Sequence, residues 1–119
     1  MYEKAADIAR LVEGKYEVAV VKKTLLIILW PEGGQPRAFQ ALCPHEKEPL
    51  ADGRFDGKVL ECRHHDWRFD GASGKCLKGK PCHLAEYPSK IENGALLVDV
   101  DGIAPIYLDN PPPKVPAAD

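Results

Sequence analysis

Two short segments of the chain combine cysteine with histidine at spacings that can hold a metal. The first is Cys43-Pro44-His45, and after sixteen further residues (46–61) comes Cys62-Arg63-His64-His65. Two thiolates and two imidazoles from such loops can surround one centre. That centre is either a tetrahedral zinc ion or a [2Fe–2S] cluster in which histidines replace two of the cysteines. The spacing therefore predicts a metal site and leaves its metal open.

All four cysteines and all four histidines lie between Cys43 and His83. This interleaving with histidine favours metal binding over a disulfide framework and suits a reducing compartment. The N-terminal residues lack the basic-then-apolar pattern of a signal peptide. The longest apolar run, Leu25–Trp30, is far shorter than the roughly 20 residues that a membrane helix needs. We therefore expect a cytoplasmic protein without a membrane segment.

Composition narrows the possible functions further. A chain of 119 residues is long enough for one domain. Its 16 basic and 18 acidic residues give a net charge of −2, which argues against nucleic-acid binding. The sequence has neither the Gly-x-Gly-x-x-Gly pattern of dinucleotide sites nor the Gly-Lys-Ser/Thr pattern of nucleotide sites. A small carrier or binding module is therefore a better expectation than an enzyme.

The elements that must position the cysteines and histidines read as strands. The first predicted strand, residues 16–21, is rich in valine and also contains an aromatic residue. The second, residues 24–30, is a continuous apolar run that ends before Pro31. Asn93-Gly94 lies between the last two patterns and is a strong hairpin signal. Only Ile8, Leu11 and Val12 have helical spacing, which predicts a short helical turn. The sequence thus predicts an all-β fold with strands at Tyr16–Val21, Thr24–Trp30, Arg37–Leu42, Val59–Cys62, Trp67–Phe69, Ala85–Ile91 and Ala95–Val100.

The pattern Cys-x-His, sixteen residues, Cys-x-x-His resembles the Rieske signature. The resemblance implies that one [2Fe–2S] cluster per chain is bound by Cys43, His45, Cys62 and His65. The surrounding segments are similar to the small bacterial Rieske ferredoxins, and the downstream ones look most like the ferredoxin component of toluene-type diiron monooxygenases. These segments are Pro49-Leu50, Asp52-Gly53, Trp67-Arg68-Phe69-Asp70, Cys82–Pro88 and Gly102–Pro105.

This resemblance also implies an architecture. Rieske ferredoxins consist of antiparallel sheets with a loop-rich subdomain that binds the cluster. For this chain we expect a single Rieske domain over residues 1–105, with a cluster-binding insert at about 43–82. A proline-rich tail over residues 106–119 follows it.

The implied function is electron transfer rather than catalysis. The protein would carry single electrons from an NADH-dependent flavin reductase to the hydroxylase of a diiron monooxygenase that acts on aromatic or alkene substrates. It would do so as a monomer, without nucleic-acid or membrane partners. Three alternatives remain: the ferredoxin of a ring-hydroxylating dioxygenase, a zinc-stabilised binding module, and a small nitrite-reductase-like subunit.

The sequence also allows expectations for several residues near the predicted ligands. High-potential Rieske proteins of respiratory complexes carry a disulfide between their ligand loops, at positions that resemble Glu48 and His64 here, so that bond is absent. Trp67 could pack beneath the second ligand loop or be exposed for docking. Cys76 and Cys82 are expected to be small buried apolar groups, because a reducing compartment disfavours a disulfide between them, and His83 is expected to be a loop or strand-edge residue.

Overall fold

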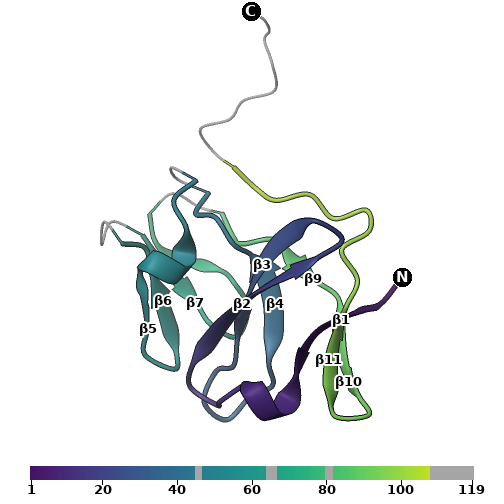
Figure 1. The fold of residues 1–119 in the computed structure, drawn as a ribbon. Helices are drawn as coiled ribbons and strands as arrows, with labels where there is room; N and C mark the ends of the chain where they lie inside the picture. The colour runs from purple at the N-terminus through teal and green to yellow at the C-terminus, as the bar shows by residue number, and fades with distance from the viewer. Residues whose placement is uncertain (45–46, 64–66, 80–81, 108–119) are drawn as a thin grey trace, which may run out of the picture.

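Three antiparallel sheets make up the computed structural model, which describes residues 1–44, 47–63, 67–79 and 82–107 (Figure 1). Their strand orders are β1–β11–β10, β2–β3–β4–β9 and β5–β6–β7–β8. The all-β prediction is confirmed. The elements are β1 (Glu3–Asp7), the 3₁₀ turn η1 (Ile8–Arg10), β2 (Tyr16–Val21), β3 (Thr24–Leu29), β4 (Arg37–Gln40), the 3₁₀ turn η2 (Leu50–Asp52), β5 (Arg54–Phe55), β6 (Val59–Glu61), β7 (Arg68–Asp70), β8 (Cys76–Lys78), β9 (Glu86–Tyr87), β10 (Ser89–Glu92) and β11 (Ala95–Val98).

The strand β3 lies at the centre of the fold because both of its faces are buried. Side chains alternate between the faces of a strand. Leu26 and Ile28 belong to one hydrophobic core, between the first two sheets. Ile27 and Leu29 belong to a second core, which also contains two of the cysteines. The continuous apolar run in the sequence therefore reflects burial on both sides.

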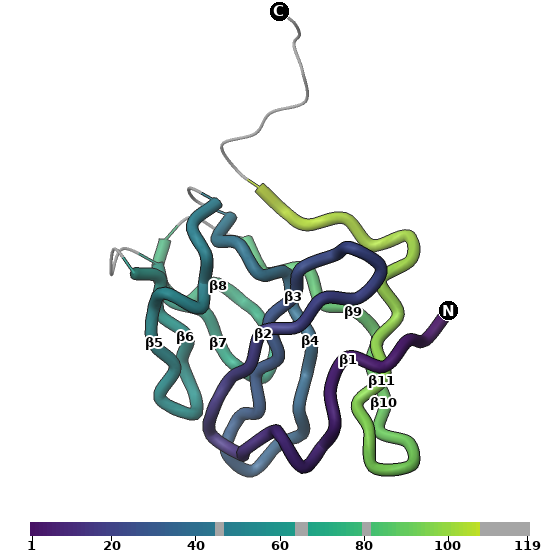
Figure 2. The backbone as a smooth tube through the Cα atoms, in the orientation of Figure 1, coloured from purple at the N-terminus to yellow at the C-terminus, as the bar shows by residue number. Residues whose placement is uncertain are grey.

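Figure 2 shows how the second sheet separates the other two. In this view the small sheet β5–β8 lies on one side of it and the β10–β11 hairpin on the other. Cys43 and Cys62, which begin the two predicted cluster loops, both belong to the second core. The second core, between the second and third sheets, is therefore the one that adjoins the predicted cluster loops.

The helical turn predicted from Ile8, Leu11 and Val12 is only partly correct. The structure has a single 3₁₀ turn, Ile8–Arg10, preceded by the strand β1. That strand was not predicted. It forms because residues 3–7 pair with β11 from the far end of the chain, and such a distant partner leaves no local pattern in the sequence.

The predicted hairpin around Asn93-Gly94 is confirmed. Both residues have positive φ angles, 52° and 76°, as a two-residue turn between paired strands requires. The preceding strand is shorter than predicted, because Pro88 interrupts it. Glu86–Tyr87 instead forms β9, which pairs with β4 in the second sheet. A single predicted strand thus contributes to two sheets.

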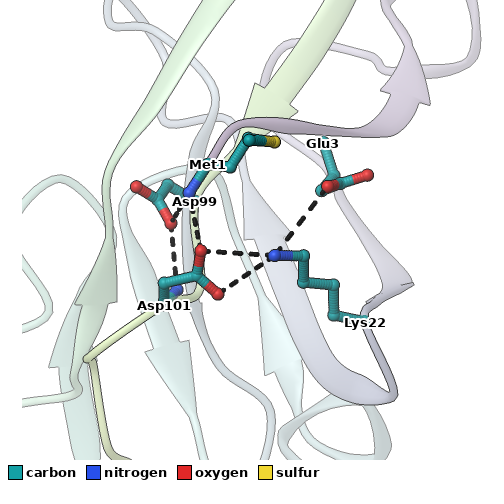
Figure 3. A network of polar contacts seen from close by, with 5 residues as sticks. All are labelled: Met1, Glu3, Lys22, Asp99 and Asp101. Carbon is teal, nitrogen blue, oxygen red and sulfur yellow. Dashed lines mark hydrogen bonds and ion pairs between the residues drawn. The ribbon is translucent and has the colours of Figure 1, made fainter.

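A network of charges ties the start of β1 to the β2–β3 turn and the segment after β11 (Figure 3). The amino group of Met1 lies 2.9 Å from an oxygen of Asp99 and 2.6 Å from one of Asp101. Lys22 donates to both oxygens of Asp101 at 3.2 Å and lies 3.9 Å from Glu3. These hydrogen bonds, first from the amino group and then from Lys22, lower the pKa of the Asp101 carboxyl.

The described part of the chain includes no helix of the length and apolar character needed to cross a membrane.

Candidate metal centre

Cys43 and Cys62 share one buried core. Their residues are 0% and 1% exposed, and both belong to the hydrophobic core that also contains Leu50 and Leu60. Cys43 follows the end of β4, and Cys62 directly follows β6. The second and third sheets therefore each deliver one thiol to the same apolar region.

Each of these cysteines begins a loop that the backbone closes on itself. Cys43 N–H donates to the Glu48 carbonyl at 2.8 Å, and Lys47 N–H donates back to the Cys43 carbonyl at 2.8 Å. In the second loop, Cys62 N–H donates to the Trp67 carbonyl at 2.9 Å. The two closed segments, 43–48 and 62–67, are the first and second ligand loops. Positions 45 and 65 fall within them by sequence.

The donors present fit a cluster that takes two thiolates on a shielded iron. Both cysteines are thiols in the structure, and the core around them keeps out water. The predicted imidazole ligands His45 and His65 lie outside the described residues, as does His64. Within the described part, no group of three or more His, Cys, Asp and Glu side chains is placed to hold a metal ion.

The comparison with protein families decides the identity. The family described as the Rieske [2Fe-2S] domain matches residues 2–88, which is most of the chain. The chain belongs to the Rieske family. Its cofactor is therefore a Rieske-type [2Fe–2S] cluster, and zinc is not needed to explain the cysteine and histidine pattern.

Individual relatives of this Rieske protein include ferredoxins. It is 30% identical over 90 residues to the ferredoxin component of the alkene monooxygenase system of Xanthobacter autotrophicus, covering 74% of this chain and 66% of that protein. It is 33% identical over 75 residues to the ferredoxin component of the naphthalene 1,2-dioxygenase system of Pseudomonas putida, covering 62% and 72%. The solved structure of a Sphingomonas yanoikuyae B1 ferredoxin matches with a TM-score of 0.71 and 28% identity, over 83% of this chain and 98% of that one.

An ion pair joins the two ligand loops of this Rieske domain. The guanidinium of Arg63 lies 3.5 Å from a carboxylate oxygen of Glu48. Glu48 is one of the two positions at which the sequence indicated that the loop disulfide of high-potential Rieske proteins is missing. The connection between the loops is therefore electrostatic here. Because both side chains are partly exposed, the ion pair contributes only about 0–1 kcal/mol to the free energy of unfolding.

A glycine brings the backbones of the two loops together. Gly53 follows η2, just after the first loop. A Cβ at this position would lie 1.9 Å from the carbonyl oxygen of Glu61 and 3.2 Å from the amide nitrogen of Arg63. These two residues flank Cys62. Gly53 is therefore required because a side chain there would collide with the backbone that carries the second thiol.

Trp67 packs inside the protein rather than lying on its surface. The residue is 6% exposed and belongs to the core that contains both cysteines. Its ring stacks on Phe69 with centroids 6.3 Å apart. Gly79 lies so close that a Cβ there would be 2.5 Å from the indole. Of the two roles that the sequence left open, the structure supports packing beneath the second ligand loop.

Gln40 is a site residue that the sequence analysis missed. It is 1% exposed, and its amide makes four hydrogen bonds. The nitrogen donates to the carbonyls of Leu42 at 2.8 Å and Ile106 at 2.9 Å. The oxygen accepts from the amides of Ala85 at 2.8 Å and Ile106 at 2.9 Å. Gln40 thereby joins the residue before Cys43 to two distant segments.

The C-terminal segment that is hydrogen-bonded to Gln40 also contacts the first ligand loop. Tyr107 follows Ile106, and the ammonium of Lys47 lies 5.0 Å from the centre of its ring. A cation over an aromatic face is stabilised by about 0.5–1 kcal/mol at exposed sites. The first loop is thus bounded on one side by the chain's residues 106–107.

We predict that Gln40→Leu lowers the free energy of unfolding by about 3 kcal/mol, because it leaves several buried backbone groups without partners. Denaturant titration followed by far-UV circular dichroism measures the change. Gln35→Leu is the matched control, since Gln35 is exposed and the same substitution there should cost less than about 0.5 kcal/mol. Equal losses in the two variants would show that the Gln40 network contributes nothing to stability.

The two remaining cysteines lie together, apart from the ligand pair. Cys76 N–H donates to the Cys82 carbonyl at 3.1 Å, and both residues are partly exposed thiols. Burial, followed by the neighbouring Cys76, raises the pKa of Cys82 to about 11. His83 is exposed, and its Nδ1 lies 3.1 Å from the carbonyl oxygen of Leu84. The prediction of His83 as a loop or strand-edge residue agrees with its position between β8 and β9, where it forms an isolated antiparallel bridge with Lys75.

Proposed function

We propose that this Rieske protein carries single electrons from an NADH-dependent flavin reductase to the diiron hydroxylase of a monooxygenase that acts on alkene or aromatic substrates. The observation that carries the proposal is the alignment over 90 residues with the ferredoxin component of an alkene monooxygenase system. A cluster that takes up one electron at a time suits a carrier rather than a catalyst. The cytoplasm, as the source of NADH, is the compartment that we propose.

We assign the ligands as Cys43 and Cys62 on the shielded iron and His45 and His65 on the outer iron. The burial of both thiols in one core supports the first half of this assignment. The second half rests on the Rieske spacing, in which each histidine follows its cysteine by two or three positions. One edge of each imidazole would then face the partner protein during electron transfer.

We also propose that residues 1–105 form one Rieske domain, acting as a monomer, with the cluster-binding insert at about 43–82 and a tail at 106–119 whose first two residues dock against the domain. Redox partners meet briefly, over small contact areas. The docking surface would therefore consist of the two ligand loops, whose described exposed cations are Lys47 and Arg63. Trp67 is buried and is no longer a candidate for the apolar anchor of that surface.

The runner-up function is electron delivery to a ring-hydroxylating dioxygenase. A specific observation favours it, since the ferredoxin component of a naphthalene dioxygenase system is 33% identical over 75 residues. Both functions use the same cluster and the same kind of reductase. They differ only in the terminal oxygenase that the reduced protein recognises.

The test is reconstitution with purified partners. The protein is reduced with NADH and a flavin reductase and then mixed with a diiron hydroxylase or with a Rieske dioxygenase, and reoxidation is followed in the visible spectrum. We expect reoxidation at least tenfold faster with the hydroxylase, and none with a Cys43→Ala protein. Faster reoxidation by the dioxygenase would favour the runner-up, whereas a colourless protein with bound zinc would contradict both.

We predict a midpoint potential near the low end of the Rieske range, at about −150 mV. The reason is that the ligand loops lack a disulfide and carry the acidic side chain of Glu48 beside the first ligand. A dye-linked redox titration measures the potential, and a value well above 0 mV would contradict the argument.

Two matched variants check the electrostatic part of this prediction. Glu48→Gln removes a negative charge and should raise the potential, because it makes the added electron more favourable. Arg63→Gln removes the paired positive charge and should lower it. Shifts in the same direction would mean that the Arg63–Glu48 ion pair acts on loop shape rather than through its charges.

A further inference from the structure

Cys76 and Cys82 are two thiols that the proposed electron-transfer role does not use. They lie on β8 and on the segment before β9, and neither is among the four proposed ligands. Both side chains are partly exposed and pack at the margin of the core that contains Cys62. Solvent can therefore reach them while the ligand cysteines stay buried.

The backbone places these two cysteines directly opposite each other. Lys75 and His83 form an antiparallel bridge, so the next residues inward, 76 and 82, face one another across it. The hydrogen bond from Cys76 N–H to the Cys82 carbonyl, at 3.1 Å, agrees with that register. Hydrogen-bonded antiparallel partners have Cα atoms about 5.5 Å apart, a separation typical of disulfides.

The side chains lie near each other as well as the backbones. The neighbouring Cys76 side chain is, after burial, a cause of the raised pKa of Cys82. Cys76 Sγ donates to the carbonyl of Lys78 at 3.2 Å. Forming a bond between the two sulfurs therefore requires no movement of one strand past the other.

The number of donors argues against a resident metal at this pair. Two thiols fall short of the four donors that a tetrahedral site needs, whereas a disulfide needs only these two. Oxidation is thus the chemistry that this geometry suits better.

We propose that Cys76 and Cys82 form a reversible disulfide when the protein meets a low-molecular-weight disulfide such as oxidised glutathione. The first cysteine attacks one sulfur of the reagent, forms a mixed disulfide and releases one thiol. The second cysteine then attacks the mixed disulfide and releases the other thiol. The pair loses two electrons and two protons, which convert one glutathione disulfide into two glutathione thiols.

The new bond would close the segment that supports the second ligand loop. Gly79 lies between the two cysteines and contacts the indole of Trp67, whose carbonyl closes that loop on Cys62. Oxidation would therefore restrain the chain beneath the second loop without consuming a proposed ligand. We expect the oxidised protein to lose its cluster to an iron chelator at least twofold more slowly.

The sequence allows a direct test by mass spectrometry. The holoprotein is incubated with oxidised glutathione, its visible spectrum is checked for an intact cluster, and the remaining thiols are alkylated in denaturant before trypsin digestion without reductant. Trypsin cuts after Lys75, Lys78 and Lys90 but not at Lys80-Pro81. Peptides 76–78 and 79–90 should therefore remain joined by the Cys76–Cys82 disulfide. The joined species should disappear after reduction.

Single-cysteine variants make the result specific. Cys76→Ser and Cys82→Ser should give no joined peptide and should instead keep glutathione on the remaining cysteine, because no second thiol can displace it. The proposal is overturned if the protein without substitutions, with its cluster intact, accumulates only glutathione adducts or unreacted thiols. A bond from either cysteine to Cys43 or Cys62 would overturn it equally.

Discussion

We expect the His65→Ala protein to lack an intact Rieske cluster, whereas the His64→Ala protein keeps it. The Cys-x-x-His spacing makes His65 the ligand and leaves His64 as its neighbour. Removing an imidazole ligand leaves one coordination position of the outer iron without its donor. Visible absorption and electron paramagnetic resonance of the reduced proteins measure the outcome, with a loss of at least tenfold in the Rieske signal for His65→Ala.

The two histidines are adjacent, so each variant is the control for the other. Both substitutions remove the same side chain from the same loop, and general damage to the loop would affect them alike. A lost signal in His64→Ala with a retained signal in His65→Ala would show that the second ligand lies one position earlier. Loss in both would mean that the loop itself, rather than one ligand, was disrupted.

The second large effect is expected at Gly53. We predict that Gly53→Ala lowers the free energy of unfolding by about 3 kcal/mol, since its methyl group would meet the carbonyl of Glu61 at 1.9 Å. Backbone cannot rotate aside as a flexible side chain can. The two ligand loops must therefore separate, and the iron content of the purified protein should fall together with stability. Denaturant titration and iron analysis measure the two effects.

Gly33→Ala is the control for this substitution. No atom lies within 4 Å of a Cβ at Gly33, although its φ is +78°, so alanine should cost only the conformational penalty of about 1 kcal/mol. Iron content in this control should stay unchanged. A Gly53→Ala protein as stable and as iron-rich as Gly33→Ala would show that the close approach to Glu61 is not needed.

The sequence predicts local structure in this protein better than long-range pairing. The apolar run at β3 and the Asn93-Gly94 turn act over neighbouring residues, and both predictions are confirmed. The strand β1 depends on β11, about ninety positions further along the chain. Pro88 splits one predicted strand between two sheets. These features depend on partners that no local periodicity reveals.

The candidate site shows the same limit. Ligand spacing is a local property, and it led directly to the four predicted ligands, two of which the structure describes as buried neighbours in one core. Gln40 looks like an ordinary polar residue in the sequence. Its importance arises from three segments that converge on it only in the folded chain. Trp67 likewise required the structure, because its sequence position fitted either surface or core.

The division of the interior into two cores bears on how the protein acquires its iron. The core between the first two sheets contains no cysteine or histidine and holds residues from both ends of the described chain. We expect that half to fold before any cluster is present. The other core contains both buried thiols and would be completed only when the cluster is inserted. The strand β3 contributes side chains to both cores. Once the first core has folded, β3 is therefore already in place, and the segments that bind the cluster can pack against its other face.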